Sequence, residues 1–225
     1  QGAGFMAAGY SRASGRVGVC LVTSGPGATN CVTPIRDSMA DSIPMVMISG
    51  QVPRAAIGSD AFQEAPIFNI MSSCAKHVFL VKNEQELEAT LRSAFDIARS
   101  GRPGPVVIDI PKDVQQYVGT FKGEGLLEFR GFDQRKLARE SKTLPRKHAE
   151  AFFAMLSQSE RPLVYAGGGV INANAAGELR EFCDTFGIPG VTTLMGIGAL
   201  DTTNPSTMHM LGMHGTAYAN YAVED

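Results

Sequence analysis

Short polar side chains gather where an apolar run ends in a Gly-Pro-Gly turn, at residues 21–30 (Leu-Val-Thr-Ser-Gly-Pro-Gly-Ala-Thr-Asn). Thr23, Ser24, Thr29 and Asn30 supply hydroxyl and amide groups that can donate and accept hydrogen bonds. Glycine allows a ligand to come close to the backbone, and open parallel sheets bind ligands at the carboxyl ends of their strands. The stretch therefore predicts a cofactor site, with an ordinary strand-to-helix turn as the alternative.

Three further side chains are candidates for contact with a substrate. Phe62 and Gln63 lie in a segment, residues 53–66, without a helical or strand period, which is typical of an active-site loop. An aromatic ring beside an amide suits a small keto acid, and a buried core position is the alternative for Phe62. Lys112 directly follows an apolar run, so we expect it at the same sheet edge as the turn. A cation there would attract a carboxylate substrate or a neighbouring subunit's cofactor, with a solvated surface lysine as the alternative.

Two other places could hold a phosphate or a nucleotide. Arg102 stands between glycine and proline, and its planar cation suits a phosphate or stacking on a ring. Gly167, Gly168 and Gly169 follow an apolar run, and their bare backbone could accommodate a dinucleotide, although they do not form the full GxGxxG pattern. The histidines further on do not have the spacing of a metal site, and we predict no metal ligands.

The elements that position these residues alternate along the first half of the chain. Short runs rich in valine or isoleucine predict strands at 17–23, 44–50, 77–81 and 105–110, and helical patterns at 2–14, 28–40 and 84–100 separate most of them. Such alternation predicts an α/β fold with a parallel sheet covered on both faces. A polar, charged stretch at 119–144 predicts an interdomain linker. A second, incomplete α/β unit follows, with helices at 146–158 and 175–186 and strands at 162–166 and 190–193.

Composition excludes several classes of function. The 225 residues are 44% hydrophobic with a net charge of −2 and no basic run longer than a dipeptide, so we expect no nucleic-acid binding. No apolar stretch approaches a membrane span and no signal segment opens the chain, so we expect a cytoplasmic protein without membrane contact. The four widely spaced cysteines predict reduced thiols. Both ends fall within helical patterns, so we expect a fragment of a longer chain.

Several motifs in order resemble the catalytic subunits of the thiamine-diphosphate-dependent acetohydroxyacid synthases, also called acetolactate synthases. The resemblance rests on residues 22–30, 50–53, 60–65, 100–105, 109–114 and 211–215, and it covers essentially the whole chain. It implies that residues 1–118 are the later part of a pyrimidine-binding domain. It also implies that residues 145–225 are the earlier part of a central, Rossmann-like FAD-binding domain, and that the family's activating glutamate stands immediately before Gln1.

The resemblance also implies roles for individual residues. Gln63 would reach the reacting end of the cofactor, with Phe62 and Lys112 as its catalytic neighbours, and Arg102 would contact FAD. The aminopyrimidine site would be lined by Thr23, Pro26, Gly27 and Asn30. The flavin would lie along Gly167, Gly168, Gly169, Thr193, Leu194, Leu211, Gly212, Met213, His214 and Gly215.

The implied activity is decarboxylation of pyruvate and transfer of the two-carbon unit to a second 2-oxo acid. Its cofactors would be thiamine diphosphate, FAD and Mg2+, with the metal ligands outside this chain. The working form would be a homodimer or larger, with a separate regulatory subunit possible, and the fragment alone would be inactive. Open alternatives are a glyoxylate carboligase or pyruvate oxidase type of enzyme, a non-catalytic dinucleotide-binding module and a structural oligomerisation domain.

Overall fold

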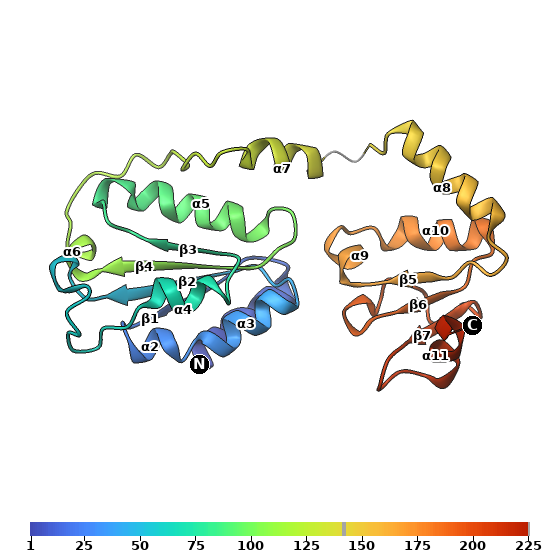
Figure 1. Ribbon diagram of the computed structural model, residues 1–225, viewed down its shortest axis with the longest axis horizontal. Helices are drawn as coiled ribbons and strands as arrows, with labels where there is room; N and C mark the ends of the chain where they lie inside the picture. Colours follow the sequence, from blue (N-terminus) through green and yellow to red (C-terminus); the bar gives the residue numbers. More distant parts are fainter. Residues whose placement is uncertain (141–142, 225) are drawn as a thin grey trace. The chain divides into compact units, whose positions relative to one another are not determined.

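The computed structural model describes residues 1–140 and 143–224, with elements labelled in Figure 1. The chain divides into two compact units, Gln1–Ser141 and Lys142–Asp225, and each is described here by itself.

A four-stranded parallel sheet forms the centre of the first unit. Its strands lie in the order β1-β2-β4-β3. Their bounds are Gly18–Val22 for β1, Met45–Gln51 for β2, His77–Leu80 for β3 and Pro105–Pro111 for β4. Each predicted strand agrees with its observed counterpart to within one residue at either end, and every residue of β4 is buried. A strand covered on both faces reads as a continuous apolar run, which explains why the pattern was visible in the sequence.

Helices cover both faces of this sheet. Figure 1 shows α5 on one side and α2, α3 and α4 on the other. Ala7 and Ala8 of α1 belong to the core on the side of α2, α3 and α4. The alternation of side chains along the strands produces two cores: Met47 and Val107 pack beneath one layer, and Val46 and Ile108 beneath the other. The helix bounds are Gly2–Ser14 for α1, Pro26–Thr29 for α2, Val32–Ala40 for α3, Ile67–Ser72 for α4, Leu87–Arg99 for α5 and Lys112–Gln115 for α6. The single helix predicted at 28–40 is thus two helices, and α4 was not predicted.

Part of the stretch expected as a linker packs against the first unit. The Leu127 N–H donates to Ser93 Oγ over 2.8 Å, and the Phe129 ring lies edge-on to the His77 ring, with centroids 5.6 Å apart. Helix α7 (Phe132–Glu140) follows, and Lys136 Nζ lies 2.8 Å from Asp96 Oδ1. Because charged residues dominate this stretch, the sequence did not show that its few apolar residues attach it to the first unit. The linker therefore cannot begin at residue 119.

The second unit holds a three-stranded parallel sheet in the order β5-β6-β7. Its strands are Val164–Ala166, Gly190–Thr192 and Thr207–Met210. Its helices are Arg146–Gln158 for α8, Gly168–Asn172 for α9, Ala176–Phe186 for α10 and Ala217–Glu224 for α11. Strand β7 was not predicted, since its methionine and histidine residues lack a β-branched pattern. The predicted parallel α/β fold class is confirmed in both units. Among the described residues, no helix has the length and apolar character needed to cross a membrane.

Candidate functional site

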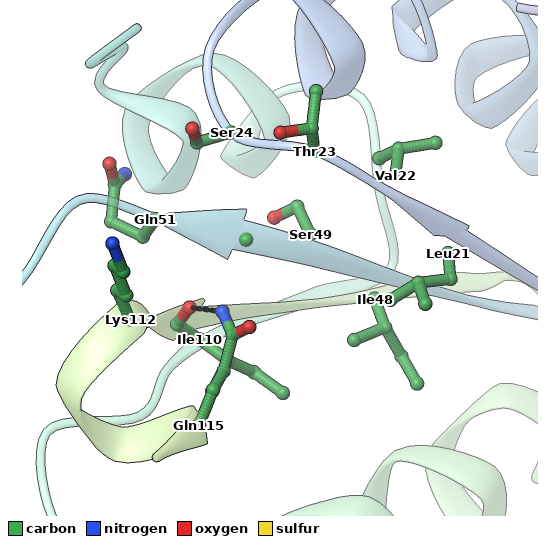
Figure 2. Close-up of a pocket in the computed structure, with 11 residues that line it drawn as sticks. Leu21, Val22, Thr23, Ser24, Ile48, Ser49, Gln51, Ile110, Lys112 and Gln115 are labelled. Atoms are coloured by element: carbon green, nitrogen blue, oxygen red, sulfur yellow. Dashed lines mark hydrogen bonds between the residues drawn. The ribbon is translucent and has the colours of Figure 1, made fainter. Parts of the chain in front are cut away.

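A cavity of about 670 Å3 lies at the carboxyl ends of β1, β2 and β4, as Figure 2 shows. Thr23 and Ser24 reach it from the end of β1, and Gln51 and Lys112 from the ends of β2 and β4. Apolar side chains, among them Leu21, line its floor. The cavity thus combines hydroxyl, amide and ammonium groups with an apolar surface, at the sheet edge where the sequence predicted a ligand.

The turn after β1 needs glycine because the next segment lies directly against it. Gly25 has φ 52° and ψ −105°, a combination that side-chain-bearing residues avoid. A Cβ atom built on Gly25 would stand 2.4 Å from the backbone oxygen of Gln63. The tertiary structure therefore brings Gln63, distant in sequence, to the predicted cofactor turn.

The other predicted residues of the turn mainly hold the turn itself. The Asn30 side-chain amide donates to the Pro26 carbonyl oxygen over 2.9 Å. The Thr29 hydroxyl donates to the Gly25 carbonyl oxygen over 3.1 Å. A Cβ atom on Gly27 would lie 2.8 Å from Thr23 Cγ2. Glycine at this position therefore leaves room for the Thr23 side chain beside the cavity.

The loop that carries Phe62 and Gln63 is closed by a carboxylate. Glu64 accepts hydrogen bonds from the backbone N–H groups of Gly58 and Ala61, the second over 3.1 Å. The bond from Gly58 is the main cause that holds the pKa of Glu64 below its ordinary value. Phe62 is 90% exposed, so the alternative that it is a core residue is wrong for the described part of the chain.

Arg54 ties together the loops that follow three strands. Its Nε lies 2.6 Å from Asp113 Oδ2, in α6. Its Nη1 donates to the Lys82 carbonyl oxygen over 2.7 Å and to Glu84 Oε2 over 3.1 Å, both after β3. Because Arg54 itself follows β2, its guanidinium links the segments that follow β2, β3 and β4.

A buried carboxyl group lies beneath the cavity. Asp109, on β4, accepts hydrogen bonds from Ser49 Oγ over 2.7 Å and from Gln51 Nε2 over 2.9 Å. Burial raises the pKa of Asp109, and these two neutral donors oppose that effect. The sequence interpretation gave Asp109, Ser49 and Gln51 no role. The available signal was a charged residue inside an otherwise apolar strand.

The two predicted cations lie at opposite ends of β4 in the first sheet. Lys112 is exposed at the carboxyl end of β4, and its side chain extends toward Gln51 in Figure 2. Arg102 precedes β4, and its guanidinium donates to Ser42 Oγ and to the carbonyl oxygens of Met39 and Ala40. Seven strand residues separate the two edges by roughly 23 Å at about 3.3 Å per residue. Arg102 therefore caps the end of α3 and takes no part in the cavity.

The predicted flavin residues gather at the carboxyl edge of the second sheet. Gly167 follows β5, Thr193 follows β6 and Leu211 follows β7. The Thr193 N–H donates to the Ala166 oxygen over 2.9 Å, and the Leu211 N–H to the Thr192 oxygen over 3.1 Å. The remaining predicted residues lie next to these in sequence: Gly168, Gly169, Leu194, Gly212, Met213, His214 and Gly215.

Leu194 and Met213 are 68% and 94% exposed at this second edge. Gly212 is fixed by Asn220 of α11, whose Oδ1 accepts from the Gly212 N–H over 2.7 Å. The Asn220 Nδ2 donates to the Gly212 carbonyl oxygen over 3.1 Å. The edge therefore offers bare backbone and apolar side chains on a loop that is held in place.

Comparison with known proteins identifies both units. Residues 1–73 match the thiamine pyrophosphate enzyme N-terminal TPP binding domain, and residues 149–225 match the thiamine pyrophosphate enzyme central domain. The chain belongs to the thiamine pyrophosphate enzymes.

Within this family, the similar proteins are acetolactate synthases. The chain is 48% identical to acetolactate synthase 1, chloroplastic, of Oryza sativa subsp. japonica over 225 residues. It is 47% identical to acetolactate synthase 1, chloroplastic, of Zea mays and 45% identical to acetolactate synthase, chloroplastic, of Arabidopsis thaliana, each over 224 residues. All of this chain is covered, and it spans 32–34% of the length of these relatives. The family resemblance stated from the motifs is confirmed.

The expected cytoplasmic location is wrong, because these similar thiamine pyrophosphate enzymes are named chloroplastic. The expectation rested on the lack of an apolar span and of a charged-then-apolar signal segment. Neither property distinguishes the cytoplasm from the interior of a chloroplast, since both are aqueous.

The four cysteines were predicted to be reduced thiols, and no metal ligands were predicted. Cys20, Cys31, Cys74 and Cys183 are free cysteines. Residues 1–140 and 143–224 contain no group of three or more acidic, histidine or cysteine side chains that could hold a metal ion.

Acid should open the loop that Glu64 closes, residues 58–64. The pKa of Glu64 is lower in the folded protein than in the unfolded chain, so its bonds stabilise the loop above the unfolded value, about 4.3. This stabilisation is lost as the pH falls through the lower, folded value. We expect amide exchange in residues 58–64, corrected for its intrinsic pH dependence, to accelerate below about pH 4. Glu64→Gln should accelerate it at pH 7. Equal exchange in the variant and the parent at pH 7 would contradict this role.

Proposed function

We propose that the protein containing these residues is an acetolactate synthase. It decarboxylates pyruvate and transfers the two-carbon unit to a second 2-oxo acid, in the biosynthesis of valine, leucine and isoleucine. The observation that carries this proposal is the 45–48% identity to acetolactate synthases across the whole chain, in both units.

The cavity of the first unit fits part of thiamine diphosphate. Its apolar floor suits the face of an aminopyrimidine ring, and the hydroxyls of Thr23 and Ser24 suit the ring's polar edge. When bound, the cofactor supplies the carbanion that adds to a keto carbon and accepts the electrons released with carbon dioxide. Pro26, Gly27 and Asn30 shape the turn that borders this site.

The chain's own residues would orient the substrate and exclude water. Gln63 lies against the cofactor turn, and its amide is proposed to reach the reacting groups. The exposed ring of Phe62 would cover the apolar part of a 2-oxo acid. The Lys112 ammonium at the rim would attract the substrate carboxylate.

The second unit fits an extended flavin. Parallel strands β5, β6 and β7 present glycine backbone and exposed apolar side chains at one edge, a pattern suited to a dinucleotide and its ring system. We propose FAD as the ligand of this edge. Arg102 was assigned to FAD by resemblance, and its hydrogen bonds to the end of α3 give it a structural role in the first unit.

Further parts of the proposal concern the larger assembly. We propose that Mg2+ is required and is bound by residues outside this chain. The working form would be a homodimer or larger assembly, and a regulatory subunit is a partner to test. The names of the plant relatives make the chloroplast the location to examine by microscopy of the tagged full-length protein.

An activity assay of the full-length protein tests the proposal. Purified protein with pyruvate, thiamine diphosphate, Mg2+ and FAD should release carbon dioxide and form acetolactate, and omission of thiamine diphosphate should abolish both. Condensation of glyoxylate, or formation of hydrogen peroxide from pyruvate, in place of acetolactate would identify another thiamine pyrophosphate enzyme. The 225-residue chain alone should give no acetolactate.

Removing the Lys112 charge should weaken substrate binding more than it slows the chemical step. In the full-length protein, we expect Lys112→Met to raise the KM for pyruvate about tenfold and to leave kcat within about threefold. The matched control is Lys147→Met, which removes the same charge from an exposed position on α8. Steady-state kinetics at several pyruvate concentrations measure both constants. An unchanged KM would remove Lys112 from the substrate site.

A further inference from the structure

Asp109 is the one charged residue of the otherwise apolar strand β4. It is 1% exposed and stands between Ile108 and Ile110, which are 0% and 7% exposed. In the parallel register, Asp109 pairs with Ser49 of β2, and Pro111 pairs with Gln51. The two β2 side chains that donate to Asp109 are therefore the one opposite it and the next one on the same face.

Gln51 connects this carboxylate to the active-site loop. Its Nε2 donates to Asp109 Oδ2 over 2.9 Å and to the Ala65 carbonyl oxygen over 3.0 Å. Its Oε1 accepts from the Val52 N–H over 2.8 Å. Both amide hydrogens and the amide oxygen are thus engaged, so the side chain has a single satisfied orientation in the 6%-exposed position it occupies.

Ala65 ends the loop that presents Gln63. Within this loop Asp60 and Gln63 have φ values of 55° and 61°, a left-handed conformation that such residues rarely adopt. Residues held in this conformation persist only where surrounding contacts fix them. Glu64 fixes the loop from within, through Gly58 and Ala61. Gln51 fixes its end from below, through Ala65.

We propose that Gln51, held by Asp109, is a positioning residue that, through Ala65, keeps Gln63 against the Gly25 turn. The link runs from β4 through β2 to a loop whose backbone lies where a Gly25 side chain would be. Fixing Asp109 in the sheet core therefore fixes a loop residue at the cavity rim. This inference rests on the proposed function only for the role of Gln63, and the geometry of the link is independent of it.

A carboxylate suits this position better than an apolar residue would. One amide hydrogen of Gln51 points toward Asp109 when the other reaches Ala65, and a buried N–H left without a partner destabilises the folded state. Asp109 accepts that hydrogen and uses its other oxygen for Ser49. Burial favours the neutral form and raises the pKa of Asp109.

Amide hydrogen exchange of the full-length protein without cofactors tests the link. Gln51→Leu should accelerate exchange at residues 57–65 by at least about tenfold, with residues 87–99 of α5 changed by less than about twofold. Ser49→Ala is the matched control, since it also removes one hydrogen bond from Asp109 but leaves the path to Ala65. Asp109→Asn should stay within about threefold of the parent, because an amide oxygen still accepts from Gln51 and the Ser49 hydroxyl can accept from the amide.

Each outcome decides the proposal. Unchanged exchange at 57–65 in Gln51→Leu would overturn it, as would equal effects of Gln51→Leu and Ser49→Ala or a uniform rise over the whole unit. If Gln51→Leu does not fold, Gln51→Asn replaces it, since the shorter amide cannot reach both Asp109 and Ala65. Kinetics give the second readout: Gln51→Leu should lower kcat at least about fivefold with less change in KM. A parent protein that does not bind thiamine diphosphate would refute the proposed function while the exchange result still decides the link.

Discussion

Replacement of Gly25 by alanine is expected to weaken thiamine diphosphate binding at the site proposed for the first unit. The new Cβ would stand 2.4 Å from the Gln63 backbone oxygen, and no side-chain rearrangement can relieve an overlap with backbone. The dihedral angles of Gly25 add a cost of about 1–3 kcal/mol for a residue with a side chain. The loop and the turn must therefore move apart, which displaces the turn residues Thr23 and Ser24 that line the cavity.

Titration of the full-length protein with thiamine diphosphate measures this effect. We expect Gly25→Ala to weaken the affinity by at least about tenfold, the factor that corresponds to 1.4 kcal/mol. The control is Gly9→Ala, an exposed position in α1 where a Cβ atom meets nothing within 4 Å. An affinity within twofold of the parent for Gly25→Ala would show that the loop does not rest on the turn.

Replacement of Gly196 by alanine is expected to have the corresponding effect on the second unit. A Cβ atom there would lie 2.4 Å from the Ala166 carbonyl oxygen and 3.1 Å from Gly167 Cα. The chain after β6 would have to move away from the end of β5, where the Gly167 N-cap of α9 lies. The two segments would then no longer present one edge to a dinucleotide.

Flavin content and unfolding together test this second prediction. We expect purified Gly196→Ala protein to retain less than about a tenth of the parent's FAD under the same conditions, and to unfold at a lower temperature. Gly177→Ala is the matched control, because its Cβ in α10 meets nothing within 4 Å. Full flavin retention by Gly196→Ala would contradict FAD binding at this edge, provided that the parent itself binds FAD.

The local elements and the family could be predicted from the sequence alone. Strands were visible because a buried parallel strand is apolar along almost its whole length, as β4 is except at Asp109. The Gly-Pro-Gly turn was visible because glycine adopts backbone conformations that other residues avoid and proline fixes φ, whatever the surroundings. These signals depend on neighbours in sequence, and so does the order of motifs that showed the family.

Which distant residues meet at the site could be seen only in the tertiary structure. Asp109 meets Ser49 and Gln51 because β4 inserts between β2 and β3 in the sheet, an order that no periodicity encodes. Arg102 and Lys112 lie at opposite ends of β4 because the extended strand runs between them, although only ten positions separate them. Gln63 reaches Gly25 because Glu64 and Gln51 fold its loop back. Such contacts join residues far apart in the chain, so their energies appear only once the sheet has assembled.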